Sequence, residues 1–300
     1  MTKFKLANAP CSWGTIENTE GERTDYAKML NELAAAGFVG TELGDLGFMP
    51  TDPEKLREEI ESRGLELVGS WVTVRLYDEA YHTAGVERAV KVAKLLAEVG
   101  GQHCTINVGD DHSTIHKRFY NTGRIKPEHA LDDAGWQTYI AGINKVAEAV
   151  EGETGLRTAL HPHGSTYVET PAEVDEFLSR TDPEKVGIVF DTGHFMLGGG
   201  DPVAGVKKYG ERIWLMHFKD FNPAVVEQAK ERNWNYQDMI GAGVFSELGT
   251  GVVDFPGVLK AMNEVGYDGW IVVEQDVLPG MGSPAENAKR NRAYLQSIGL

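Results

Sequence analysis

Short apolar runs alternate with amphipathic helical segments along almost the whole chain, and this alternation restricts the possible folds more than any other feature. Nearly uninterrupted β-branched and aromatic runs are typical of parallel strands that are buried on both faces. Eight successive strand–helix units predict an α/β fold whose strands close into a (β/α)8 (TIM) barrel. We predict these eight strands at Lys5–Ala9, Gly40–Leu43, Glu66–Val72, His103–Val108, Arg157–Leu160, Val186–Phe190, Ile213–Phe218 and Trp270–Val273.

Helix start signals separate the predicted strands. Asp52-Pro53 and Thr170-Pro171 each place an N-cap residue before a proline at the first helical position. An open doubly wound sheet is the rival fold, but it usually carries a glycine-rich dinucleotide motif after an early strand, and none is present there. Because 300 residues suit one barrel and no linker interrupts them, we expect residues 1–300 to form a single domain.

Two connections are longer than the others and follow the carboxyl ends of the fourth and seventh strands. They run over Gly109–Gly135 and Phe221–Gly251. Barrel active sites are built from the loops at this end of the strands. We therefore hypothesise that both loops form a lid. Hydrogen exchange that found both loops as protected as the core in the absence of ligand would contradict this.

The charge balance argues against several kinds of partner. The chain has 29 Lys and Arg against 45 Asp and Glu, and its net charge of −16 repels nucleic acid and anionic membranes. No apolar stretch has membrane-spanning length, and the first residues do not resemble a signal peptide. Cys11 and Cys104 are too few for a disulfide framework. We expect a cytoplasmic protein that binds neither nucleic acid nor membrane, and homo-oligomerisation is left open.

Four successive strands bring a polar side chain to the same end of the predicted barrel: His161, Asp191, His217 and Glu274. Ionisable groups in apolar strands are unfavourable unless they pair with one another or coordinate an ion. Alone, each histidine could be structural and the aspartate could be a helix N-cap. The four together predict a site for one divalent metal. Imidazole and carboxylate ligands suit Mn²⁺ or Co²⁺, with Zn²⁺, Fe²⁺ or Mg²⁺ as alternatives.

Further ionisable residues at this rim are candidates for contact with a substrate. His163 and His194 follow the fifth and sixth strands, and His163 is an alternative to His161 as a ligand. Glu42, at the end of the second strand, is a candidate catalytic carboxylate or the partner of a cation in the barrel. Lys219 follows the predicted ligand of the seventh strand by two residues. It can therefore reach a substrate oxygen, pair with Glu42 or form a structural salt bridge.

Three other residues near the rim have weaker interpretations. Trp13 and Trp71 could form apolar walls against a sugar ring, although core packing is the preferred interpretation of Trp71. Cys11 also lies at the rim, but the sequence indicates no base beside it, and we do not assign it as a nucleophile.

Several segments together resemble a known family. The chain is similar to the xylose-isomerase-like barrel superfamily over almost its whole length, and within it to the inosose dehydratases of myo-inositol catabolism. Members of the superfamily usually hold their metal through Glu, Asp, His and Glu. Asp191, His217 and Glu274 match the last three, and His161 replaces the first Glu, as the inosose dehydratase branch tends to show. The resemblance is carried by NAPCSWG (Asn8–Gly14), GTELG (Gly40–Gly44), LHPHGSTYVET (Leu160–Thr170), FDTGH (Phe190–His194), HFKD (His217–Asp220) and LGTGVVDF (Leu248–Phe255).

The resemblance implies a metal-dependent hydro-lyase that removes water from a 2-keto-inositol through an enolate. The metal would stabilise the enolate, and a protein group would carry the proton taken from the carbon beside the ketone. Under this mechanism Glu42, His163 or His194 carries the proton. Lys219 orients or protonates an oxygen, and Glu274 is a catalytic carboxylate as well as a ligand. The substrate class is a polyol ketone or keto-sugar.

Other functions compete with this one. A ketose isomerase or epimerase would need a second carboxylate opposite Glu274, where His161 stands. β-Elimination from a 3-keto-glycoside would use the same enolate chemistry. A nuclease of the endonuclease IV type would need three metals and histidines after the second and third strands, which the sequence does not show. A non-catalytic metal-bearing regulatory protein would not need so open a polar rim. We predict an enzyme, with the dehydratase as the preferred activity.

Overall fold

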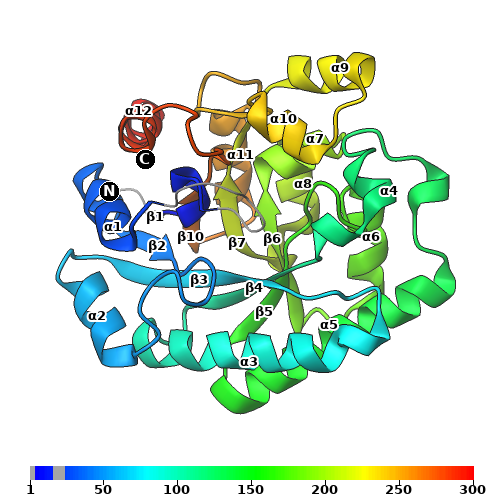
Figure 1. Ribbon diagram of the computed structural model, residues 1–300, viewed down its shortest axis with the longest axis horizontal. Coiled ribbons are helices and arrows are strands. Elements are labelled where there is room, and N and C mark those ends of the chain that lie inside the picture. The colour runs from blue at the N-terminus through cyan, green and yellow to red at the C-terminus, as the bar shows by residue number, and fades with distance from the viewer. Residues whose placement is uncertain (1–3, 16–23) are drawn as a thin grey trace.

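The computed structural model describes residues 4–15 and 24–300, within which eight parallel strands close into a barrel. The strands follow one another around it in the order β1-β10-β7-β6-β5-β4-β3-β2 (Figure 1). The predicted TIM barrel is confirmed, each predicted strand is present to within two residues at either end, and the open sheet is excluded. The strand bounds are β1 Lys5–Asn8, β2 Gly40–Glu42, β3 Glu66–Thr73, β4 Thr105–Gly109, β5 Arg157–Leu160, β6 Val186–Asp191, β7 Ile213–Phe218 and β10 Trp270–Val273.

Helices cover the outside of the barrel, and the long helices α3 and α5 lie side by side (Figure 1). The predicted start signals are present: Asp52 accepts a hydrogen bond from the backbone N–H of Lys55, and Thr170 forms a capping box with Glu173. Among the described residues, no helix is both long enough and apolar enough to cross a bilayer. The outer helices are α1 Tyr26–Ala35, α2 Pro53–Glu61, α3 His82–Val99, α5 Asp133–Thr154, α6 Pro171–Arg180, α8 Pro202–Tyr209, α11 Phe255–Glu264 and α12 Pro284–Ser297.

Apolar side chains fill both the inside of the barrel and the layer between strands and helices. The inner group mixes small residues such as Ala7 and Ala159 with larger ones such as Leu215, so the interior is packed. Successive residues of a strand point to opposite faces. Because Leu215 points inward, His217 does so as well, one layer nearer to the carboxyl end of β7. The polar site therefore lies directly on the apolar core of the barrel.

A small antiparallel sheet closes the long loop after β7. It pairs β8 (Asp220–Phe221) with β9 (Phe245–Ser246). The carboxylate of Asp220 accepts hydrogen bonds from the backbone N–H groups of Gly249, Gly251 and Val253. The HFKD and LGTGVVDF segments therefore form one structural unit. The loops at this end also contain α4 His116–Phe119, α7 Thr192–Leu197, α9 Pro223–Arg232 and α10 Tyr236–Gly241.

Candidate metal centre

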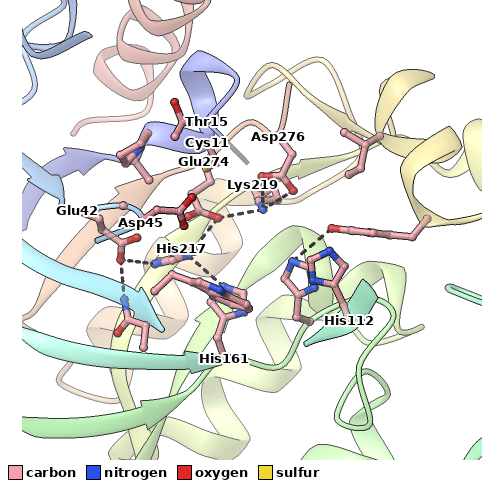
Figure 2. Close-up of a pocket in the computed structure, with 18 residues that line it drawn as sticks. Cys11, Thr15, Glu42, Asp45, His112, His161, His217, Lys219, Glu274 and Asp276 are labelled. Atoms are coloured by element: carbon pink, nitrogen blue, oxygen red, sulfur yellow. Dashed lines mark hydrogen bonds and ion pairs between the residues drawn. The ribbon is translucent and has the colours of Figure 1, made fainter. Parts of the chain in front are cut away.

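A cavity opens at the carboxyl ends of the barrel strands (Figure 2). Asp191, the last residue of β6, and His194, in α7, are buried in contact with its lining. The structure thus brings all the predicted site residues together, although they come from five different strands or the segments that follow them. The predicted residues that line the cavity themselves are Glu42, His161, His163, His217, Lys219 and Glu274.

The four predicted metal ligands converge on one point. Each of His161, Asp191, His217 and Glu274 offers a ligand atom, and these atoms all lie within 4.8 Å of one another. His217 Nδ1 is 3.2 Å from His161 Nε2, 3.3 Å from Glu274 Oε2 and 3.8 Å from Asp191 Oδ2. All four side chains are buried. The pairing of β6 with β7 contributes directly, because it sets Asp191 beside His217.

Hydrogen bonds orient the two imidazoles of this group. His161 Nδ1 donates to the backbone oxygen of Pro162 at 3.0 Å, and His217 Nε2 donates to Glu42 Oε1 at 3.2 Å. A neutral imidazole has one N–H and one lone pair. The lone pairs of His161 Nε2 and His217 Nδ1 therefore face each other across 3.2 Å. Two lone pairs cannot form a hydrogen bond, so the arrangement requires an added proton or a cation between them.

The carboxylates at this point also favour a cation. Asp191 Oδ1 accepts a hydrogen bond from the backbone N–H of His194, but Asp191 Oδ2 is buried without a hydrogen-bond partner. Burial alone would lower the pKa of His217, yet Glu274 and Glu42 outweigh it and raise this pKa to about 10. An unsatisfied buried oxygen is costly unless something positive contacts it. The two nitrogen and two oxygen ligands therefore fit one divalent metal.

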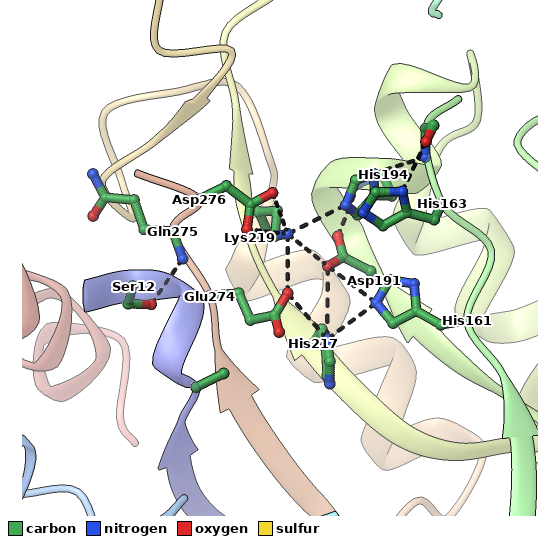
Figure 3. A network of polar contacts seen from close by, with 12 residues as sticks. Ser12, His161, His163, Asp191, His194, His217, Lys219, Glu274, Gln275 and Asp276 are labelled. Atoms are coloured by element: carbon green, nitrogen blue, oxygen red, sulfur yellow. Dashed lines mark hydrogen bonds and ion pairs between the residues drawn. The ribbon is translucent and has the colours of Figure 1, made fainter. Parts of the chain in front are cut away.

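Lys219 places a buried ammonium group beside the predicted metal ligands (Figure 3). Its Nζ lies 3.0 Å from both carboxylate oxygens of Asp276, 2.9 Å from Glu274 Oε2 and 3.6 Å from Asp191 Oδ2. Burial would lower the pKa of Lys219, but Asp276 and Glu274 outweigh it and raise this pKa well above its usual value. The expectation that Lys219 could pair with Glu42 is wrong, because its carboxylate partners follow β10 or end β6.

Rings of histidine and tyrosine form one wall of the cavity. The rings of His163 and His194 are in contact, tilted by 37° with centres 3.9 Å apart, and the Tyr236 hydroxyl donates to His163 Nε2 at 3.3 Å. His163 Nδ1 donates to the backbone oxygen of Gly164, which leaves the Nε2 lone pair as the acceptor. Burial lowers the pKa of both histidines well below the usual range, so both are neutral at neutral pH.

The two tryptophans have different roles from those expected. Trp71 lines the cavity, and its ring centre lies 5.4 Å from that of His161 and 5.3 Å from that of His163. The preferred interpretation of Trp71 as a core residue is therefore wrong. Its indole occupies the space that a side chain at Gly109 would fill, so glycine is needed there. Trp13 is buried outside the cavity lining, where its indole N–H donates to Glu32.

Cys11 lies in the cavity rim beside Glu274 and Asp276, but its environment makes it a poor nucleophile. Burial, together with these two carboxylates, raises the pKa of its thiol well above the usual value. The thiolate is the reactive form of cysteine. The raised pKa of this thiol supports leaving Cys11 out of the candidate catalytic residues.

Asn107, Tyr236 and Asp276 are among the cavity-lining residues that sequence analysis did not single out. Asp276 follows Glu274 by two residues, so strand alternation could have placed both on the same side. Asn107 is a polar residue in the otherwise apolar strand β4, which is also a readable signal. No local pattern marks Tyr236, because only the folding of the loop after β7 brings it to the cavity.

The two long loops meet over the cavity. His112, after β4, and Tyr236, in α10, have ring centres 5.7 Å apart. The first loop is held by Arg118, a fully buried residue that forms two hydrogen bonds of 2.8 Å with the carboxylate of Glu173. This ion pair links the residues around α4 to α6. That the two loops form a lid stays a prediction.

The barrel and the histidine–carboxylate cluster at its carboxyl end define a class of protein. A profile of the xylose isomerase-like TIM barrel family matches residues 30–298, and the chain belongs to this family. Its relatives include the inosose dehydratase of Geobacillus thermodenitrificans (strain NG80-2), which is 30% identical over 296 residues, or 98% of this chain and 97% of that protein. The rhizopine catabolism protein MocC of Rhizobium meliloti is 33% identical over 299 residues, or 98% and 88% of the two chains. The resemblance inferred from the motifs is confirmed.

Solved structures of the same fold are more distant in sequence. The IOLI protein, whose structure has a binding zinc atom, superposes with a TM-score of 0.71 at 15% identity and covers 98% of both chains. The probable 3-DHS dehydratase AsbF of Bacillus anthracis gives a TM-score of 0.71 at 17% identity, and the match covers 98% of this chain and 99% of that one. At these identities the likeness establishes the fold alone.

Proposed function

We propose that this protein is a metal-dependent hydro-lyase that removes water from a 2-keto-inositol, as the names of its inosose dehydratase relatives suggest. One observation carries the proposal: four buried ligand atoms lie within 4.8 Å of one another at the catalytic end of a barrel. His161, Asp191, His217 and Glu274 would hold one divalent ion, with Mn²⁺ or Co²⁺ preferred. His163 then contacts substrate and is not a ligand.

The chain's own residues would position and polarise the substrate. When bound, the metal would supply electrophilic stabilisation for the negative charge that develops on the ketone oxygen. Lys219 would donate a hydrogen bond to a substrate oxygen, since its ammonium borders the cavity and is held in place by Asp276 and Glu274. Preorganised donors of this kind stabilise charge without reorganising during the reaction.

The candidates for the proton carrier are Glu42, His163 and His194, and they differ in the hydrogen bonds that they already form. His194 Nδ1 accepts from the backbone N–H of Gly164, and His194 Nε2 lies 3.2 Å from Lys219 Nζ, so both of its ring nitrogens already have partners. Glu42 Oε1 already accepts hydrogen bonds from Asn107 and His217. His163 is neutral and lines the cavity, and its Nε2 accepts a single, longer hydrogen bond of 3.3 Å from the Tyr236 hydroxyl, which a substrate could displace. We assign proton removal to His163, which can return the same proton to the departing hydroxide and so release water.

The reaction can be tested with purified protein whose metal content has been measured. We expect Mn²⁺- or Co²⁺-dependent loss of water from scyllo-inosose, followed by the absorbance of the dione product, and no reaction with a panel of ketohexoses. In deuterated water a dehydratase, an isomerase and an epimerase all exchange a carbon-bound proton, but only the dehydratase loses water. Epimerised ketohexose without water loss would support the isomerase or epimerase alternative instead. Release of the aglycone from a 3-keto-glycoside would support β-elimination.

The role of His163 gives a first specific prediction. His163→Ala should lower kcat by about 10²–10⁴-fold, the usual contribution of a positioned acid or base, and should leave metal content unchanged. The matched control is His116→Ala, which removes an exposed histidine outside the cavity. Full turnover by His163→Ala would exclude it as the proton carrier. Loss of metal from the same variant would make it a ligand.

A further inference from the structure

A line of hydrogen bonds crosses the barrel interior and ends on a proposed metal ligand. The Thr105 hydroxyl donates to Asn107 Oδ1 at 2.8 Å, and Asn107 Nδ2 donates to Glu42 Oε1 at 2.6 Å. His217 Nε2 donates to the same Glu42 oxygen at 3.2 Å, a contact visible in Figure 2. All four side chains are buried, so water does not compete for these bonds.

The chemistry of these groups allows only one direction of donation. A carboxylate accepts hydrogen bonds and donates none. The Asn107 amide therefore turns its NH2 group to Glu42 and its oxygen to Thr105. For the same reason His217 must carry its proton on Nε2, the atom that faces Glu42. With a metal bound, the lone pair of His217 would be on Nδ1, which faces His161 and Glu274.

The contact between Asn107 and Glu42 depends on a glycine in the strand between them. Asn107 lies on β4 and Glu42 on β2, and Gly69 on β3 pairs with Glu42 on one side and with Thr105 on the other. A Cβ atom at Gly69 would lie 3.1 Å from Asn107 Nδ2 and 2.9 Å from the backbone oxygen of Thr105. The β2–β3 register also shifts between Thr41 and Glu42. Because Gly69 has no side chain, the Asn107 amide can reach Glu42 across β3.

We propose that Asn107 is a positioning residue that acts through Glu42 to hold His217 in the Nε2-protonated tautomer, so that Nδ1 faces the metal. The inference rests on the metal site of the proposed function, and it gives Glu42 a positioning role in place of proton transfer. Outer partners of metal-bound histidines fix the tautomer and the ring orientation, and their loss typically weakens metal binding about 10–100-fold.

The test compares two buried asparagines in the barrel. Asn107→Ala should weaken Mn²⁺ binding about tenfold or more, measured as the dissociation constant in competition with a chelating dye. The control is Asn8→Ala on β1, whose amide nitrogen has no hydrogen-bond partner and whose Oδ1 accepts from the neighbouring backbone N–H of Ala9. It should leave the dissociation constant unchanged. Glu42→Gln should weaken binding as well. In Zn²⁺-loaded, ¹⁵N-labelled protein it should also shift the Nε2–H signal of His217, which a merely structural role would not do.

The outcomes separate the inference from the function on which it rests. If the wild type binds Mn²⁺ and Asn107→Ala binds it as tightly as Asn8→Ala does, the inference is wrong and the proposed metal site stands. If the wild type binds no divalent metal, both are wrong. Thr105→Val serves as a second variant should Asn107→Ala fail to fold, because it keeps the side-chain shape and removes the first donor. Unchanged metal affinity in folded Thr105→Val would also contradict the inference.

Discussion

At the scale of single residues, the balance of charge in the site depends on Lys219. Its ammonium shares one buried space with Asp191, Glu274 and Asp276. A divalent ion and this lysine would together bring three positive charges against three carboxylates. Buried charges are tolerated when they are paired in this way. The lysine therefore stabilises the carboxylates and also competes with the metal for Glu274.

Replacing Lys219 should separate these two effects. Lys219→Met should destabilise the metal-free protein by about 3–5 kcal/mol, because it leaves buried carboxylates without their partner. Mn²⁺ should then raise the Tm of this variant more than that of the wild type, since the carboxylates lack the positive charge of the lysine. The control is Lys208→Met, which breaks an exposed pair with Asp175 and should cost about 0–1 kcal/mol. Equal unfolding free energies for the two metal-free variants would contradict the argument.

At the scale of structural elements, one buried carboxylate joins two loops at the rim. Glu169 accepts hydrogen bonds of 2.7 Å from the backbone N–H groups of Gly123 and Ser165. Ser165 has a φ of 72°, a left-handed conformation that these contacts hold in place. Burial raises the pKa of Glu169 to about 7. The loop after β5, which carries His163, is therefore linked to the long loop after β4 by a group that titrates near neutrality.

This raised pKa predicts how stability depends on pH. The folded protein binds the Glu169 proton more tightly than the unfolded chain does, so stability falls as pH rises from about 4.5 to about 7, by about 3 kcal/mol at most. Glu169→Gln removes this titration, and the free energy of unfolding of the wild type should decline relative to that of the variant between pH 5 and pH 8. Glu184→Gln, at an exposed position, is the control and should track the wild type. A pH-independent difference between wild type and Glu169→Gln would refute the prediction.

At the scale of the whole molecule, the proposed metal connects strands from half of the barrel. Its ligands follow β5, end β6, lie in β7 and follow β10, so the ion binds only when these strands are assembled. A ligand that binds only the folded state stabilises it by about 2.7 kcal/mol at a concentration of 100 times its Kd. Metal content should therefore be visible in global unfolding as well as in activity.

Removing the metal should lower the melting temperature. For a protein of this size we expect a chelator to reduce Tm by about 5 °C relative to protein in excess Mn²⁺, because about 1 kcal/mol corresponds to about 2 °C. Added Mn²⁺ should restore both Tm and turnover. His217→Ala should show no such shift, since it lacks a ligand. The same response to chelator in His217→Ala and wild type would mean that the stabilising ion binds elsewhere.

The amino-acid sequence alone determined the strands, the helix caps and the barrel, because these depend on local periodicity and on short-range hydrogen bonds such as that of Thr170. It also marked His161, Asp191, His217 and Glu274, since a polar residue that ends an apolar strand is visible without coordinates.

Only the tertiary structure decided which groups these residues contact. The partners of Lys219, the place of Trp71 in the cavity wall and the path from Asn107 past Gly69 to Glu42 depend on strand register and on space between distant segments. Local sequence patterns do not record either quantity, because they describe neighbours along the chain and not neighbours across the barrel.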